Sequence, residues 1–235
     1  APDFEYTSFV PGYDAVNGDY HPNDNHGHGT HVAGTIAQST NNGRGVAGIA
    51  FQVALMPVKV LDGSGAGYVS DIAEGIRWAA DNGADIINMS FATAYPSTTL
   101  EDAIVYAYHE KRVLLVASSG NAGGSQPQYP AAYDEVIAVG ATTYAEQTAD
   151  YSNRGNELCA PGGTDKEDLN GDGYKDMVLQ NTFEPESTNY CAFSYWFFAG
   201  TSMAAPHVSG LAALVRSQNT TLTHVEIRAI LSDTA

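Results

Sequence analysis

Alternation between short apolar segments and helical patterns constrains the fold of this chain more than any other feature. The segments Asp85–Ser90, Val113–Ala117 and Val136–Ala141 have the length and apolar character of buried strands. A helical pattern over Leu100–Glu110 separates the first from the second. Strands that alternate with helices pair in parallel through right-handed crossovers. The sequence therefore predicts an α/β fold built on a mostly parallel sheet.

Capping residues and periodicity predict the remaining elements. Ser70 is the expected N-cap of an amphipathic helix that ends at Gly83. Thr98 and Glu101 have the spacing of a capping box before the helix over Leu100–Glu110. Residues 1–27 are expected to form loops with one short strand, and Asp165–Tyr190 breaks the alternation as an insertion would. The other expected elements are a helix over Thr30–Ser39, a strand over Ala54–Leu61, a helix from Ser202 to about Ser217 and a short helix after Thr223.

Length and charge narrow the class of protein. A chain of 235 residues can bury one large core, so we expect residues 1–235 to form a single domain. The 27 acidic and 10 basic residues give a formal net charge of −17, which argues against nucleic acid or an anionic membrane as a partner. No apolar run is long enough to cross a bilayer, and we expect any signal peptide to have been removed. These properties fit a secreted, extracellular protein.

One serine lies in a setting suited to nucleophilic catalysis. In Gly200–Pro206 (GTSMAAP), Ser202 stands between a glycine turn and an apolar run that predicts a buried helix. A serine hydroxyl becomes an effective nucleophile when a base takes its proton and dipoles stabilise the resulting oxyanion. His28, in the glycine-rich segment His26–Gly34 (HGHGTHVAG), is the candidate base. Each residue also has a simpler structural interpretation, Ser202 as a helix N-cap and His28 as a packed histidine.

Together with Ser118–Gly123 (SSGNAG), these segments resemble the subtilisin-like serine proteases, and they follow the order of that family. The resemblance covers about Val10–Ala235 and implies a three-layer fold with helices on both faces of the sheet. It implies that Ser202 is the nucleophile and His28 its general base. It also implies that the Asn121 amide stabilises the oxyanion beside the backbone N–H of Ser202. The expected function is that of a secreted serine endopeptidase.

The resemblance is incomplete before His28. In the family a catalytic aspartate ends an apolar strand in the middle of the sheet, and no such strand precedes His28 here. We therefore expect the chain to lack this N-terminal strand, and we expect its partners to be polypeptide substrates and its own N-terminal fragment, a pro-segment or an inhibitor. Two alternatives remain: a peptide-binding module with impaired catalysis, and a peptide cyclase or other acyl transferase.

The family resemblance also implies a substrate cleft. Its members bind an extended peptide between two edge segments, which here match Gly65, Ala66 and Gly67 on one side and Ser90, Phe91 and Ala92 on the other. Ser118 and Gly120 are expected in the wall of the pocket for the side chain before the scissile bond. Because these segments carry no charge, we expect that pocket to prefer apolar or aromatic side chains.

Alternate oxygen-bearing residues predict a calcium loop within the insertion. The ligands would be Asp168, Asn170, Asp172, the Tyr174 carbonyl and Asp176, with Gly171 and Gly173 among them. Leu179 stands where such a loop normally has its last glutamate, so the affinity is expected to be modest. A solvated Asx-rich turn is the alternative. Asn41–Val46 resembles a second calcium loop of the family, which in relatives also uses residues of the absent segment.

Three further expectations concern individual residues. A disulfide between Cys159 and Cys191 would close the insertion and contribute roughly 3–4 kcal/mol, the alternative being two separate thiols. The family resemblance makes Tyr129–Pro130 a candidate cis peptide. The remaining histidines of the motifs are expected to be structural: His26, His31 and His207.

Overall fold

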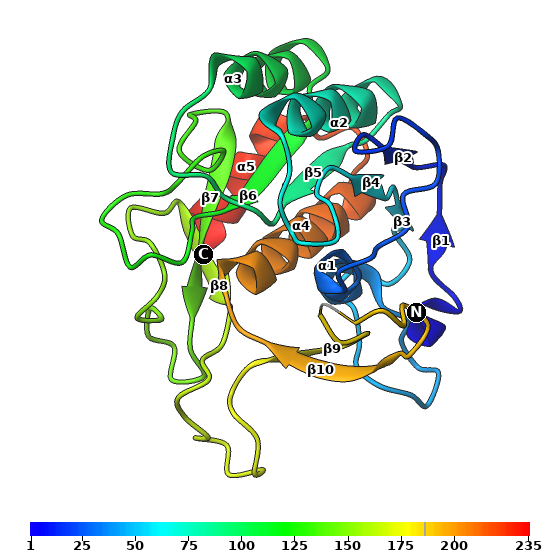
Figure 1. The fold of residues 1–235 in the computed structure, drawn as a ribbon. Coiled ribbons are helices and arrows are strands. Elements are labelled where there is room, and N and C mark those ends of the chain that lie inside the picture. Colours follow the sequence, from blue (N-terminus) through cyan, green and yellow to red (C-terminus); the bar gives the residue numbers. More distant parts are fainter. Residues whose placement is uncertain (186) are drawn as a thin grey trace.

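The computed structural model describes residues 1–185 and 187–235 (Figure 1). Its α-helices are α1 (His28–Ala37), α2 (Val69–Asp81), α3 (Thr98–Val105), α4 (Thr201–Gln218) and α5 (His224–Thr234). A short 3-10 helix, η1 (Pro2–Phe4), and a π-helical turn, η2 (Tyr106–Glu110), complete the helices. The strands are β1 (Ser8–Phe9), β2 (Tyr13–Asp14), β3 (Ala54–Leu55), β4 (Val58–Lys59), β5 (Ile86–Met89), β6 (Leu114–Ser118), β7 (Val136–Thr142), β8 (Leu158–Pro161), β9 (Val178–Thr182) and β10 (Ser194–Phe198).

The predicted parallel sheet is confirmed. Its strands lie in the order β5-β6-β7-β8, and each neighbouring pair is parallel. Within the described residues β5 pairs with β6 alone, so its other edge is free. The expected strand over residues 54–61 is instead two short strands, β3 and β4, which pair in parallel with β1 and β2 rather than with the main sheet.

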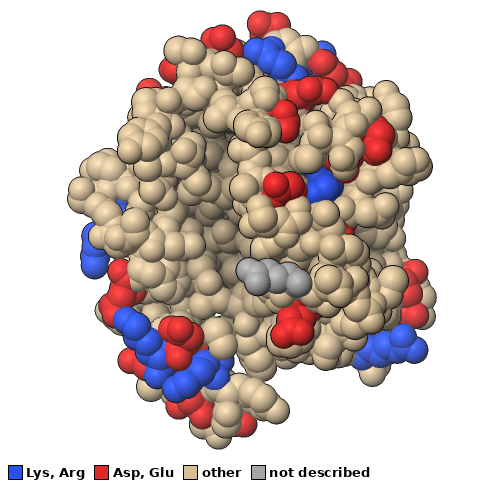
Figure 2. Space-filling model, viewed as in Figure 1, with Lys and Arg blue, Asp and Glu red and all other residues tan. Residues whose placement is uncertain are grey.

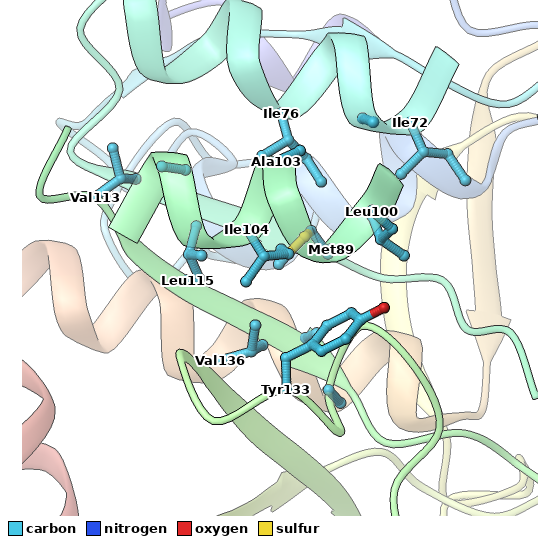
Figure 3. Packing of buried hydrophobic residues seen from close by; sticks show 14 of the residues in the cluster. Ile72, Ile76, Met89, Leu100, Ala103, Ile104, Val113, Leu115, Tyr133 and Val136 are labelled. Atoms are coloured by element: carbon cyan, nitrogen blue, oxygen red, sulfur yellow. The ribbon is translucent and has the colours of Figure 1, made fainter. Parts of the chain in front are cut away.

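Alternate residues of the central strands build two cores. Leu115 and Ala117 of β6 pack with α2 and α3, whereas Leu114 and Val116 of the same strand pack with α4 and α5. Figure 3 shows the first of these clusters, in which Ile104 and its neighbours fill the space between the helices and the strands. Because side chains of a strand point alternately to its two faces, this pattern places helices on both sides of the sheet. The expected three-layer arrangement is therefore confirmed.

The helix starts differ from two sequence predictions. Ser97 rather than Thr98 caps α3, because its side chain accepts the N–H of Leu100. α2 begins one residue before Ser70, after Tyr68, and Ser70 donates its hydroxyl to Asp71 instead of capping. Both errors are shifts of one or two residues, which local patterns do not resolve.

The segment expected as an insertion is partly regular. β9 lies within it and pairs antiparallel with β10, and this hairpin packs against α1, as Figure 1 also shows. Residues 162–177, before the hairpin, form a long loop without helix or strand. Two short strands, β1 and β2, lie in the first 27 residues where one was expected. In the described part of the chain, no helix is long and apolar enough to cross a bilayer.

The predicted disulfide is not formed. Cys159 and Cys191 are free, exposed thiols. Cys159 lies on β8 beside Gly140 of β7, whereas Cys191 lies in the connection between β9 and β10, and that hairpin packs against α1. The two cysteines thus belong to different parts of the fold. The expected cis peptide between Tyr129 and Pro130 is present.

Candidate active site

Ser202 is the second residue of α4, directly after a glycine turn. Its Oγ donates a hydrogen bond to the carbonyl of Ser90 at 3.1 Å, and the Ser90 hydroxyl donates to the Ser202 carbonyl at 2.8 Å. These bonds fix the start of α4 against the end of β5. The backbone N–H of Ser202 lies in the first turn, where an α-helix supplies no acceptor of its own. It is therefore available to an anion at the N-terminus of α4.

Asn121 follows β6 and is oriented by α4. Its Oδ1 accepts hydrogen bonds from the Thr201 N–H at 2.9 Å and from the Thr201 hydroxyl at 2.8 Å. Thr201 Oγ1 in turn accepts the Gly120 N–H at 3.2 Å. Since Oδ1 already accepts two hydrogen bonds, the Nδ2 of Asn121 is the part of the amide that can donate to a ligand. Sequence patterns had no means of revealing this role of Thr201.

His28 is the first residue of α1 and shares a cavity with the two residues above. The cavity has a volume of about 400 Å³, and His28, Asn121 and Ser202 all line it. Figure 2 shows that this face of the molecule is hollowed along a cleft whose walls carry mostly uncharged residues. The three candidate catalytic residues are at least 81 positions apart along the chain, and the fold brings them together around one space. Pro185 and Phe197 line it as well, so the hairpin region reaches the cleft.

Burial makes His28 a poor base in this chain. Burial, and to a smaller degree the neighbouring His26, lowers the pKa of the half-buried His28 to about 4. Within the described residues, no carboxylate hydrogen-bonds to its ring. A general base works best when its pKa lies near the operating pH, and a carboxylate partner is the usual means of raising it. Within the described residues, the site therefore lacks a carboxylate that would pair with His28.

Asp24 is the acidic residue nearest in sequence to His28, but its oxygens are occupied. They accept hydrogen bonds from the backbone N–H groups of His26 (2.8 Å), Gly27 (2.9 Å) and Thr30 (2.8 Å) and from the Thr30 hydroxyl (2.7 Å). Burial by itself would raise the pKa of this carboxyl, but these hydrogen bonds outweigh burial and hold it below its usual value. Asp24 thus fixes the loop that carries His28 and caps α1.

The other motif histidines differ in position. His31 is fully buried, with Nε2 within 3.1 Å of the Val178 carbonyl, and stacks on Phe198, as a structural histidine would. His207 hydrogen-bonds to the Met203 carbonyl within α4. His26, expected to be structural, instead lines the cavity with His28 and packs against Gly65, where a Cβ would lie 3.3 Å from its Nε2.

The structure brings some of the predicted cleft residues to Ser202 and places others beside His26. Gly65, Ala66 and Gly67 form an exposed turn beside His26, closed by the Asp62 N–H to Ala66 carbonyl bond. Ser90 contacts Ser202 directly, and the Phe91 carbonyl accepts the Ser118 hydroxyl at 3.3 Å. A second cavity of about 320 Å³ brings together Ala92, Ser118, Gly120, Asn121, Ala122, Gln128, Thr201 and Ser202. Gln128 was not singled out in the sequence.

The expected calcium ligands do not converge. Asp168 accepts the N–H groups of Gly171 and Gly173, Asn170 accepts that of Asp172, and Asp172 accepts that of Tyr174. Over the described ranges, no group of three or more His, Cys, Asp or Glu side chains is placed to hold a metal ion. The side chains thus satisfy their own turn, as in the alternative of an Asx-rich loop. Asp176 is the exception: it is buried, and its Oδ1 has no partner within the described structure.

The second expected loop, Asn41–Val46, packs on an aspartate that the sequence did not mark. Asp3 is buried, and its oxygens accept the side-chain amides of Asn42 at 2.7 Å and Gln38 at 2.5 Å. These two amides and the Tyr195 hydroxyl, at 3.3 Å, therefore occupy the Asp3 carboxylate.

One cavity is lined by Ser202, His28 and Asn121, as the resemblance to the subtilisin-like serine proteases led us to expect. The sequence profile of the Subtilase family matches residues 2–235, and the chain belongs to this family. It is 42% identical over 228 residues to the Thermophilic serine proteinase of Bacillus sp. (strain AK1), covering 96% of this chain and 51% of that protein. It is 43% identical over 230 residues to Subtilisin Savinase of Lederbergia lenta, covering 97% of this chain and 75% of that protein.

Solved structures agree with this assignment. A protease of Pseudoalteromonas arctica superposes with a TM-score of 0.88 at 34% identity, covering 97% of this chain and 77% of the protease chain. Sphericase superposes with a TM-score of 0.84 at 33% identity, covering 100% of this chain and 78% of its own. The chain thus spans about half the length of the Bacillus proteinase and about three quarters of the solved proteases.

Proposed function

We propose that this chain is the larger part of a secreted serine endopeptidase. The observation that carries the proposal is the single cavity lined by Ser202, His28 and Asn121. Ser202 Oγ would attack the peptide carbonyl while His28 takes its proton. The oxyanion would receive hydrogen bonds from Asn121 Nδ2 and the Ser202 N–H. His28 would then protonate the leaving amine, and water would hydrolyse the acyl-enzyme by the same steps.

We further propose that the missing carboxylate comes from a segment of the same protein that pairs with β5. Two features support this. The outer edge of β5 is free within the described residues, and Ile86 and Ile87 on it are only half-buried although they are apolar. An unpaired, apolar strand edge is a template for another strand. In subtilisin, loss of the aspartate alone lowers kcat by a factor of about 3 × 10⁴. Residues 1–235 alone would therefore be nearly inactive.

One observation supports an alternative, a peptide-binding module with impaired catalysis. It is the pKa of His28, which burial lowers to about 4. Turnover by the complete natural protein distinguishes the two functions, because a binding module would hold peptides without cleaving them.

We also propose a weak calcium site at Asp168–Asp176, on the basis of one observation. The buried Oδ1 of Asp176, which has no hydrogen-bond partner within the described structure, would be available to coordinate a cation in the loop. Calorimetric titration with calcium chloride should show uptake with a Kd in the range of about 10⁻⁴–10⁻³ M typical of weak extracellular sites. Asp176→Asn should weaken it, and Asp233→Asn, on the exposed end of α5, should not. The absence of heat in the natural protein would leave the loop as an Asx-rich turn.

The test of the proposed activity compares two serine variants of the natural protein on α4. Ser202→Ala should abolish hydrolysis of a denatured protein substrate. Ser217→Ala, whose hydroxyl only bonds the Leu214 carbonyl in the last turn, should leave it unchanged. Equal activity of Ser202→Ala and the natural protein would exclude Ser202 as the nucleophile.

A further inference from the structure

The loop that carries Asn121, residues 120–124, depends on support from outside itself. Gly120 has a φ of 104° and Gly123 a φ of 64°, and both values lie in the left-handed region that favours glycine. Asn121 and Ala122, between these glycines, are exposed. Glycines give a loop many accessible conformations, whereas an oxyanion donor acts only from a fixed position. Contacts with another part of the chain must therefore hold this loop.

Asn153 supplies such contacts from the connection between β7 and β8. Its side chain is buried, with the residue only 2% exposed. Its Oδ1 accepts the backbone N–H of Ala122 at 3.1 Å and that of Gly124 at 2.9 Å. Its own backbone N–H donates to the Gly120 carbonyl at 3.0 Å. One residue thus binds the loop at three points, on both sides of Asn121.

These bonds hold the two peptide planes that flank Asn121. The Gly120 carbonyl belongs to the plane before Asn121, and the Ala122 N–H belongs to the plane after it. A residue has only two soft backbone dihedrals, φ and ψ, because its peptide planes are rigid. With both planes bonded to Asn153, the direction of the Asn121 Cα–Cβ bond is fixed. Thr201 then orients the amide at the end of that side chain.

The loop keeps other contacts when the Asn153 side chain is removed. The Gly123 N–H donates to the Tyr151 carbonyl at 2.8 Å, and the backbone bond of Asn153 does not depend on its side chain. Because Ala122 is exposed, water can accept the hydrogen bond of its N–H. The loop should therefore stay attached, while the peptide plane after Asn121 gains freedom to move.

We propose that Asn153 is a positioning residue, whose side chain aims the Asn121 amide at the oxyanion. This inference rests on the proposed function, in which Asn121 Nδ2 donates to that oxyanion. The donor must lie within hydrogen-bond distance of the place that the oxyanion occupies in the transition state. A displaced donor should therefore lower kcat, whereas KM should change little because the ground-state carbonyl depends less on it.

A double-mutant cycle on the natural protein tests whether Asn153 acts through Asn121. Hydrolysis of a p-nitroanilide peptide gives kcat and KM, at a temperature at which circular dichroism shows each variant to be folded. Asn153→Ala should lower kcat about 10–100-fold, up to the cost of a misplacement of about 1 Å. In Asn121→Leu, which has no donor left to position, the same substitution should lower kcat by less than about twofold. Residues that act independently would instead show the product of the two losses.

Asn181→Ala is the matched control, because Asn181 is also a buried asparagine, whose Nδ2 donates to the Ser194 carbonyl at 3.2 Å. It should lower the Tm and leave kcat unchanged. If Asn153→Ala does not fold, Asn153→Ser, which is too short to reach both N–H groups, replaces it in the cycle.

Three results would overturn the inference. They are a folded Asn153→Ala with the natural kcat, a loss confined to KM, and losses that multiply in the double variant. Failure of the proposed function gives a different result, because the natural protein itself would then cleave no peptide.

Discussion

At the scale of single residues, the geometry assigns different tasks to the two ends of the Asn121 amide. Oδ1 accepts two hydrogen bonds from Thr201, and these bonds leave Nδ2 free for the role at the oxyanion that we propose. The motif around Asn121 could be identified from the sequence, because its glycines and its position after a strand are local features. The role of Thr201 could not, since it depends on a contact with Asn121, 80 positions away along the chain.

Asn121→Leu tests this assignment. Removal of one oxyanion donor in subtilisin, a relative and the source of this magnitude, costs about 10²–10³ in kcat. The same loss is expected here, with KM changed little, because the ground-state carbonyl depends less on this donor. Thr201→Val removes only the orienting hydroxyl and should cause a smaller fall in kcat. Steady-state kinetics that showed the loss in KM alone would place Asn121 in substrate binding instead.

At the scale of elements, α1 depends on Asp24 for its start. This carboxylate accepts four hydrogen bonds from the loop and from Thr30, and together they place His28 at the cavity. Asp24→Ala should therefore lower the free energy of unfolding by about 1–3 kcal/mol, as expected when buried N–H groups lose their acceptor. Urea unfolding followed by circular dichroism measures it. Asp19→Ala, on a neighbouring turn, is the comparison and should have a smaller effect.

The free cysteines give a second prediction at this scale. Because both thiols are exposed and lie in different parts of the fold, the native chain should react with two equivalents of a thiol reagent without added reductant. Two equivalents only after reduction would show that the disulfide forms. The sequence did not reveal that the two cysteines are separated, because their separation depends on the packing of the β9–β10 hairpin against α1.

The elements also show which parts of the fold local sequence patterns can predict. The buried parallel strands were predictable because β5, β6 and β7 are short and almost wholly apolar. β9 escaped prediction because it buries Gln180 and Asn181, whose polar side chains hide its strand character. These residues are tolerated there because Gln180 bonds to Thr35 and Asn181 to the Ser194 carbonyl.

At the scale of the whole molecule, buried histidines link stability to pH. Burial lowers the pKa of His28 and His31 to about 4 and lowers that of His207. In the unfolded chain these groups take up protons near their usual pKa of about 6.5, so the unfolded state binds more protons as the pH falls. The free energy of unfolding should therefore decrease between about pH 7 and pH 4.

Urea midpoints at pH 7, 6 and 5 measure this dependence. This decrease occurs at higher pH than the titration of carboxyls such as Asp24. The pKa of Asp24 is lowered in the folded chain, so its contribution to the free energy of unfolding is lost only at more acidic pH. His31→Gln should reduce the slope between pH 7 and 5, whereas the exposed His21→Asn should not. A midpoint that rises toward pH 5 would contradict neutral, buried histidines.

The proposed activity requires that Ser202 be an activated nucleophile in the whole protein. The most direct measurement is labelling of the purified natural protein with a fluorophosphonate, followed by mass spectrometry of its peptides. We expect rapid labelling at Ser202 and no labelling of Ser202→Ala. Residues 1–235 alone should be labelled slowly, because His28 lacks its carboxylate. A natural protein that remains unlabelled at Ser202 while its fold is intact would contradict the claim.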